Sequence, residues 1–220
     1  QVATVCSIAS DPKGLFRIQI SLNTGDYQSK IWARVSNFYA TNGAGAGFLP
    51  EIGDEVIVGF MDSDPNSPVV LGALYSSKNA PAHDLSDSND IKSIVTRSKL
   101  KLSFDDGKKV INLTTPGQNT LTLDDAHNQI VLSDQNGNVV TMDVDGIRIS
   151  SAKSISFNAA EHINLSATGK IEINGKQAVT TKSANIANEA DVSFSAKGSA
   201  SAEVSASGVT NIKGAMVMIN

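Results

Sequence analysis

Two pairs of adjacent carboxylates are the strongest candidates for chemistry in this sequence. Asp105-Asp106 and Asp124-Asp125 could act as general acid and base, a role that needs two carboxyl groups facing one cleft. Each pair, however, follows a short apolar stretch that alternates like a strand, and neighbouring residues on a strand point to opposite sides. We therefore expect both pairs to occupy solvent-exposed turns and not a catalytic site.

The histidines and the single cysteine give little support for a metal site. His83, His127 and His162 match none of the usual zinc spacings. In a trimer His162 would recur three times and could form a metal-binding ring, but it shares the parity of polar residues that face outward. Cys6 has no partner for an internal disulfide and is expected to be a small buried residue.

The sequence also lacks a Gly-x-Ser-x-Gly nucleophile elbow and a phosphate-binding loop. We therefore expect a protein that is not an enzyme, with no catalytic residue, no cofactor and no metal.

Charge and hydropathy argue against nucleic-acid binding and against a membrane-spanning helix. The formal net charge is −4, and the first 75 residues carry four basic side chains against seven acidic ones. Single-stranded nucleic acid binds to basic grooves with stacking aromatics, so this balance argues against nucleic acid. No apolar run approaches the roughly 18 to 20 residues that a membrane-spanning helix needs.

Composition divides the chain into two halves. Eight of the aromatic residues lie in the first 75 positions, whereas the second half is rich in Ser, Thr, Asn, Ala and Gly. Residues 76–90 are small and polar, as in an exposed connector. We predict a barrel domain at 1–75, a connector at 76–90 and a rod at 91–220.

The first half is typical of a small closed β-barrel. Short alternating stretches such as 16–20 and 31–35 are separated by turn sequences such as Asp11-Pro12-Lys13-Gly14. About five strands in this length favour the five-stranded OB type of barrel.

The second half repeats a pair of apolar residues at positions i and i+2. Successive pairs are 7 to 10 residues apart, and the spacing settles at eight from Ile147 onward. The pairs share one strand face, while the other parity is polar. The predicted core positions are Ile147, Ile149, Ile155, Phe157, Ile163, Leu165, Ile171 and Ile173.

A unit of eight residues provides one strand and one bend, which is too short for a full turn of a single-chain solenoid. Three chains that wind about one axis would close a prism, so we predict an intertwined, trimeric β-helix. The alternative is an antiparallel meander, favoured by turn pairs such as Asp106-Gly107 and Asn136-Gly137. A meander would leave one apolar face uncovered.

Several motifs, in order, resemble one family. Residues 6–8, 11–20, 32–35, 47–60 and 64–72, with Phe104-Asp105-Asp106, Thr115-Pro116-Gly117 and residues 212–220, are similar to VgrG proteins, the spikes of type VI secretion and related contractile injection systems. The resemblance implies an all-β chain, a gp5-like OB barrel followed by a trimeric β-helix needle. It covers essentially the whole chain.

The resemblance also implies partners. Full-length relatives place a hub region before the OB domain, and this chain opens at the OB domain. The resemblance therefore implies tube and hub proteins as partners at the N-terminal end, but no particular hub contact is carried over. Some phage relatives insert a lysozyme domain after the barrel, for which residues 76–90 leave no room. Family needles carry effectors and a conical PAAR-repeat protein, and we expect the PAAR protein to bind at Met216, Val217, Met218, Ile219 and Asn220. An uncapped tip closed by its own side chains is the alternative.

These expectations describe a puncturing spike. It would assemble in the bacterial cytoplasm and be ejected across the envelope into a target cell or the medium, where it pierces membranes mechanically. The competing interpretation is a tail fibre or adhesin that presents a receptor-binding site on a trimeric β-rod, although such proteins usually carry a distinct tip domain.

Overall fold

The computed structural model describes residues 1–24 and 27–218, and its regular secondary structure consists almost entirely of strands. One 3₁₀ turn, η1 (Met61–Ser63), is the only helical element in this part of the chain. Among the described residues there is no helix with the length and apolarity needed to cross a membrane. The predicted all-β class is therefore confirmed.

Five strands in the first half close into a barrel. They are β1 (Val2–Ser7), β2 (Ile18–Thr24), β3 (Tyr27–Val35), β6 (Glu55–Phe60) and β7 (Pro68–Leu74), in the order β1-β2-β3-β7-β6. All neighbours are antiparallel except β3 and β7, which pair in parallel. The predicted five-stranded barrel of OB type is what the first half forms.

Alternating side chains fill the barrel. On β2, for example, Ile18 and Ile20 are fully buried, and on β6 Val56 and Val58 point inward in the same way. The complete set of buried apolar residues is Ala3, Val5, Ile18, Ile20, Leu22, Ala33, Val56, Val58 and Val70. Because strand side chains alternate with period two, the sequence pattern of these strands fixes which residues form the core.

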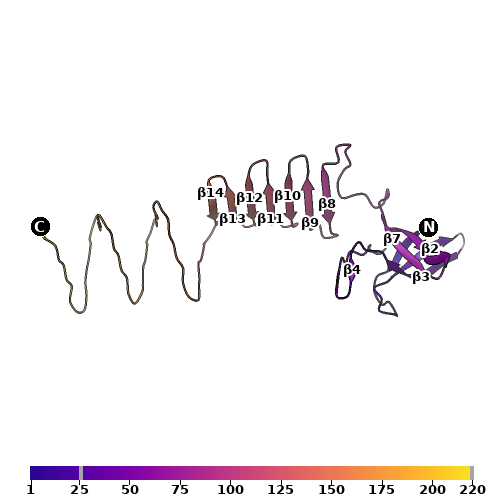
Figure 1. Ribbon diagram of the computed structural model, residues 1–220, viewed down its shortest axis with the longest axis horizontal. Helices are drawn as coiled ribbons and strands as arrows, with labels where there is room; N and C mark the ends of the chain where they lie inside the picture. Colours follow the sequence, from indigo (N-terminus) through magenta and orange to yellow (C-terminus); the bar gives the residue numbers. More distant parts are fainter. Residues whose placement is uncertain (25–26, 219–220) are drawn as a thin grey trace. The chain divides into compact units, whose positions relative to one another are not determined.

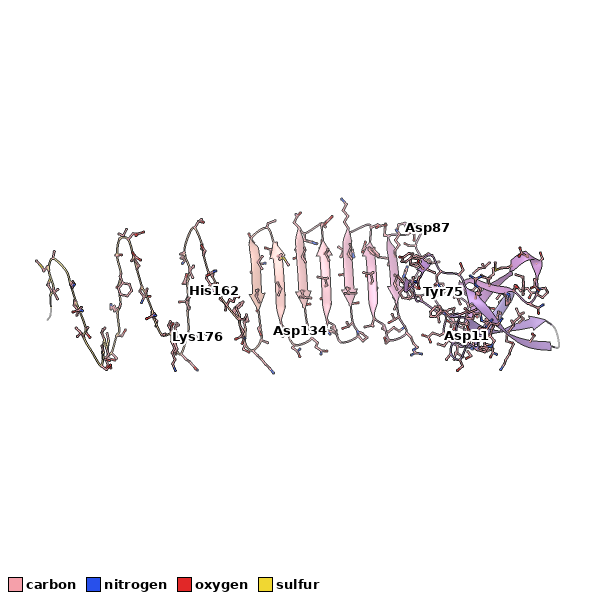
Figure 2. The ribbon with its side chains drawn as sticks, turned by 60° about the horizontal axis from the view of Figure 1, so that its bottom comes forward. Asp11, Tyr75, Asp87, Asp134, His162 and Lys176 are labelled. Atoms are coloured by element: carbon pink, nitrogen blue, oxygen red, sulfur yellow. The ribbon has the colours of Figure 1, made fainter. Side chains whose placement is uncertain are left out.

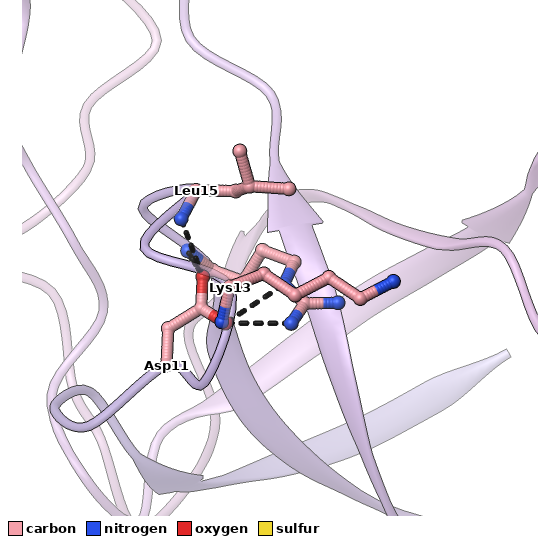
Figure 3. Close-up of polar contacts among 4 residues, drawn as sticks. Asp11, Lys13 and Leu15 are labelled. Carbon is pink, nitrogen blue, oxygen red and sulfur yellow. Dashed lines mark hydrogen bonds and ion pairs between the residues drawn. The ribbon is translucent and has the colours of Figure 1, made fainter.

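One carboxylate organises the loop between β1 and β2 (Figure 3). Asp11 accepts hydrogen bonds from the backbone N–H groups of Lys13 at 3.0 Å and Leu15 at 2.8 Å, and it pairs with Arg17 at 2.6 Å. The bond from the Arg17 guanidinium, with these backbone N–H groups, holds the pKa of Asp11 well below its usual range. The loop can therefore hold Phe16 at a φ of 56°, which is rare for a residue with a bulky side chain.

Between β3 and β6 the chain makes a separate hairpin, β4 (Ala40–Thr41) and β5 (Ala44–Gly45). Two residue pairs hold it together, Ala40 with Gly45 and Thr41 with Ala44. Gly45 has to be glycine, since a Cβ there would lie 2.8 Å from the carbonyl oxygen of Tyr39. The hairpin is not part of the barrel wall.

The second half begins with a seven-stranded antiparallel sheet, visible in Figure 1 as a row of arrows of alternating direction. Its strands follow in chain order: β8 (Ile91–Val95), β9 (Lys101–Asp105), β10 (Val110–Thr114), β11 (Thr120–Asp124), β12 (Gln129–Ser133), β13 (Val139–Asp143) and β14 (Gly146–Ser150). Residues 91–150 of one chain thus adopt the meander that was the alternative interpretation. The intertwined arrangement remains a prediction for the residues that follow.

Turn chemistry explains why the chain folds back on itself here. Equivalent turns recur every 19 residues, beginning at Thr96, Thr115 and Asp134. In each one, a side-chain oxygen of the first residue accepts the N–H of the residue four positions later, at 3.1, 3.2 and 2.9 Å respectively. The fourth residue has positive φ each time, as three-residue hairpin loops require: Lys99, Gln118 and Gly137.

After Ser150 the character of the chain changes. Residues 151–218 form neither helix nor strand, and nearly all of them are exposed. The chain divides into two units, Gln1–Ser156 and Phe157–Asn220. In Figure 1 the described part of the second unit is an extended zigzag, and residues 157–218 form no backbone ladder with other described residues.

Candidate trimerisation surface

One face of the sheet β8–β14 carries two unbroken rows of apolar side chains. The strand register places these residues directly opposite one another on neighbouring strands. The first row is Phe104, Ile111, Leu123, Ile130, Met142 and Ile147, and the second is Leu102, Leu113, Leu121, Leu132, Val140 and Ile149. We call these two rows the apolar face.

Within the described residues of the first unit, 1–24 and 27–156, nothing covers the apolar face. Leu113 is 50% exposed, Leu132 53% and Ile147 71%. Contiguous apolar patches of this extent are rare on monomeric soluble proteins and mark contact surfaces. A single antiparallel sheet of this kind becomes stable when another layer buries its apolar side.

The opposite face is mostly polar, although Val110, Val131 and Val139 also lie on it, and some of its polar side chains bond to one another. Thr122 Oγ1 donates to Asn112 Oδ1 at 2.8 Å, and the hydroxyl groups of Thr120 and Ser133 are 2.6 Å apart. Such pairs need no further partner, so this face suits contact with water. The sheet therefore has one apolar side and one mostly polar side.

Ionised carboxylates accept hydrogen bonds that stabilise the turns at both ends of the strands. Hydrogen bonds from the Asn138 backbone and the Asn136 side chain lower the pKa of Asp134, labelled in Figure 2, to about 2. At the opposite ends of the strands, a hydrogen bond from His127 lowers the pKa of Asp124, and one from Arg148 lowers the pKa of Asp143. Protonated forms would lose these bonds, so the turns stay intact at neutral pH.

A groove of about 800 Å³ follows the last strand of the sheet. Leu132, Ile149 and Ile155 contribute apolar side chains to it, and Asn138 and Ser151 contribute polar groups. Strand β14 pairs with β13 alone among the described strands, so its other edge offers free backbone groups beside this groove. An unpaired edge next to an apolar groove is a template for another strand.

The predicted core positions are split between the two units. Ile147 and Ile149 lie on β14, and Ile155 lines the groove that follows this strand. Phe157, Ile163, Leu165, Ile171 and Ile173 lie in the extended second unit, where they are between 53% and 73% exposed. Their role in a trimer core stays a prediction, because a single chain gives them no neighbours to pack against.

The predicted tip is only partly described. Met216 is 79% exposed, Val217 50% and Met218 75%, so no described residue of the second unit covers these side chains. Ile219 and Asn220 lie outside the described residues.

The residues considered for catalysis are not brought together. Asp105 binds the backbone N–H of Lys108 at 2.9 Å, Asp106 pairs with Lys92, and Asp124 pairs with His127 at 2.8 Å. These are contacts within or between neighbouring turns, in the positions expected for the carboxylate pairs.

The remaining candidates are equally scattered. His83 Nδ1 is 3.2 Å from Ser93 Oγ, and His162 is exposed in the second unit (Figure 2). Residues 1–24 and 27–218 contain no group of three potential metal ligands. Cys6 is half-buried and not fully buried as expected, because it has the parity of β1 residues that face out of the barrel.

The spacing of the apolar pairs does not reveal the 19-residue repeat of turns. Its signal is in the sequence: Asp105, Asp124 and Asp143 are spaced by 19 and end alternate strands. Two strands of five residues with two turns make one such unit. This longer period predicts the meander.

Comparison with known proteins agrees with this architecture. Residues 1–75 match the family model of the type VI secretion system/phage-baseplate injector OB domain. Residues 109–180 match that of the phage baseplate V C-terminal trimerisation domain. The second match begins within the sheet and continues into the extended unit, so it spans both parts of the candidate surface.

Individual relatives are similar over part of the chain's length. The chain is 35% identical over 98 residues to the actin cross-linking toxin VgrG1 of Vibrio cholerae, covering 41% of this chain and 9% of that protein. It is 33% identical over 90 residues to the type VI secretion system spike protein VgrG4b of Pseudomonas aeruginosa, covering 40% and 11%. For the spike protein VgrG5 of the same organism the identity is 33% over 82 residues, covering 36% and 10%.

The matched part corresponds to only about a tenth of the length of each of these relatives. The two family models, in contrast, together match about two thirds of this chain, in the order barrel then trimerisation domain. On this evidence the chain belongs to the family of VgrG-type spike proteins of type VI secretion systems and phage baseplates.

Proposed function

We propose that this chain is the barrel and needle of a puncturing spike, which works as a homotrimer and pierces target envelopes when a contractile apparatus fires. The observation that carries the proposal is the uncovered apolar face, followed by an extended segment with no backbone partner of its own. Both lie within or beside the matched trimerisation domain. The role is mechanical, and no catalytic step is part of it.

Three copies can satisfy both features at once. Three sheets with their apolar faces turned toward a common axis form a closed prism with a dry centre and polar outer walls. Beyond Ser150, each extended segment can pair with the segments of the other two copies, so that every level of the needle has three strands. Interleaved strands cannot leave singly without breaking pairs on both sides, which resists local unfolding under load.

The proposal includes partners and a place of action. Hub and tube proteins would hold the trimer at its barrel end, a PAAR-repeat protein would bind at residues 216–220, and effectors would travel with the spike. Assembly would take place in the bacterial cytoplasm, before ejection across the envelope into a target cell or the medium. The exposed apolar side chains of Met216, Val217 and Met218 support a docking role for this segment.

Deletion of residues 216–220 tests the tip assignment. Threefold strand addition would satisfy both the backbone groups and the apolar side chains of this segment, so its loss should lower capture of a co-expressed PAAR protein at least tenfold. The measurement is a pull-down, with trimer mass checked by light scattering. Glu203→Gln, an exposed change within the needle, serves as the control and should capture normally. Undiminished capture by the shortened trimer would show that the tip protein binds elsewhere.

A further inference from the structure

We propose that Asn42, in the turn of the β4–β5 hairpin, is a site of spontaneous deamidation. Its carboxamide is converted into a carboxylate by attack of the next backbone nitrogen, and no enzyme is needed. The modification places a negative charge in a segment that otherwise has none, since residues 36–50 contain no Asp, Glu, Lys, Arg or His.

The reaction passes through a cyclic imide. The backbone nitrogen of Gly43 forms a bond to Cγ of Asn42, its proton passes to the departing side-chain nitrogen, and ammonia leaves. Water then opens the succinimide ring at either carbonyl carbon. One opening gives aspartate, and the other gives isoaspartate, in which the main chain runs through Cγ. Both routes consume a water molecule and release ammonia, and neither changes an oxidation state.

The sequence offers this dipeptide three times, at Asn42-Gly43, Asn136-Gly137 and Asn174-Gly175. From the residue types alone the three pairs should react alike. The structure separates them, because ring closure needs a free backbone nitrogen, a free carboxamide and a backbone that can leave its folded conformation.

Asn42 has the free groups that the reaction needs. Thr41 pairs with Ala44 across the hairpin, so Asn42 and Gly43 are the residues of the turn between them. The closing hydrogen bond of such a turn uses the N–H of Ala44 and leaves that of Gly43 free. Within residues 1–24 and 27–218, neither the Gly43 nitrogen nor the Asn42 carboxamide has a hydrogen-bond partner.

The surroundings of the turn allow the rearrangement. Asn42 and Gly43 are exposed, and a Cβ built on Gly43 would meet nothing within 4 Å. Gly43 has a φ of 72°, and glycine can leave this conformation at little cost. The hairpin is held by two residue pairs, and an isolated hairpin is marginal in water, so the turn should open often.

Asn136 serves as an internal control, because Asp134 holds the same dipeptide in place. Asn136 Nδ2 donates to Asp134 Oδ2 at 3.1 Å, and the Asn136 backbone N–H donates to Asp134 Oδ1 at 2.8 Å. The Gly137 N–H donates to Asp134 O at 3.3 Å, so the attacking nitrogen and the leaving group are both engaged. Because these bonds must break before the ring can close, Asn136 should react about tenfold more slowly than Asn42.

Asn174 reports on assembly and not on the hairpin. It is exposed in the extended second unit, where its carboxamide donates to Glu172 Oε1 at 2.8 Å. In the proposed trimer, strands of the other copies would restrain this segment, and Asn174 should react more slowly than Asn42. The inference about Asn42 does not depend on the trimer.

Deamidation would change the hairpin in charge and in backbone length. Either product adds a carboxylate to the uncharged segment 36–50. Isoaspartate also adds a carbon to the main chain of the turn, which then no longer fits the pairing of Thr41 with Ala44. The hairpin of an aged chain should therefore be acidic and less ordered.

Peptide mapping of the full chain tests the site. The purified protein is kept in mildly alkaline buffer, and samples taken over time are digested and analysed by mass spectrometry, with aspartate and isoaspartate separated. Asn42 should be converted about tenfold faster than Asn136 and should give both products. Asn42→Gln is the matched variant. Its ring closure would need a larger, less favoured ring, so its carboxamide should persist over the same period.

Conversion of Asn42 no faster than that of Asn136 would overturn the inference. Aspartate without isoaspartate would also overturn it, because direct hydrolysis does not pass through the cyclic imide, and so would equal loss of the carboxamide from Asn42→Gln. Conversion of Asn174 as fast as that of Asn42 would instead contradict the trimeric needle and leave the Asn42 site in place.

Discussion

Replacement of Ile163 by aspartate is expected to prevent assembly of the needle. In the proposed trimer this position faces the axis, so the substitution brings three carboxylates together in a dry interior with no cation to pair with. Each uncompensated buried charge costs several kcal/mol, and three like charges add repulsion. We expect a loss of trimer in light scattering and a large fall in melting temperature.

The neighbouring position provides the control. Asn164 has the opposite parity and should face water, so Asn164→Asp introduces the same charge one residue away at a cost within about 0.5 kcal/mol of zero. Both variants add one carboxylate per chain, on opposite sides of the strand. Equal melting temperatures for the pair would mean that residues 147–173 do not present the faces assigned to them.

A second large effect is expected in the sheet. Leu132→Asp places a carboxylate in the middle of the apolar face, where the single chain leaves Leu132 53% exposed. If this face were open to water, the change would be nearly neutral. Because we expect it to be buried against two other copies, the substitution should cost several kcal/mol and favour monomers.

Thr141→Asp is the matched control for this variant. Thr141 lies on the polar face of β13, directly opposite Arg148 on β14, so an aspartate there gains a cation as its neighbour. Thermal unfolding and sedimentation of both variants should separate them clearly. A Leu132→Asp protein that melts with the control would show that the apolar face stays exposed.

The barrel could be predicted because its information is local. Ile18 and Ile20 alternate with polar neighbours, and Asp11-Pro12-Lys13-Gly14 marks a turn, so strand, face and boundary follow from short stretches. The role of Asp11 as acceptor for three backbone N–H groups and for Arg17 could not be predicted in this way. It depends on how the loop closes in space.

The second half shows a different limit. Residues such as Ile111 and Leu113 alternate identically whether the strand pairs with its own chain or with another copy, so period two cannot distinguish a meander from an intertwined helix. The conformation of the turns decides between these two arrangements. Lys99 and Gln118 adopt positive φ although neither is glycine, asparagine or aspartate, and turn rules do not anticipate this. Beyond Ser150 the partners that we propose are other copies, which a single chain does not contain.

The mass of the unmodified chain in solution tests the central claim most directly. Each chain has a mass of 23.0 kDa, and light scattering or sedimentation of the purified protein should give three times that value, without dissociation on dilution to the nanomolar range. In the proposed spike, the other two copies cover the apolar face and pair with the extended segment. A folded, stable monomer would contradict the trimeric spike and everything proposed from it.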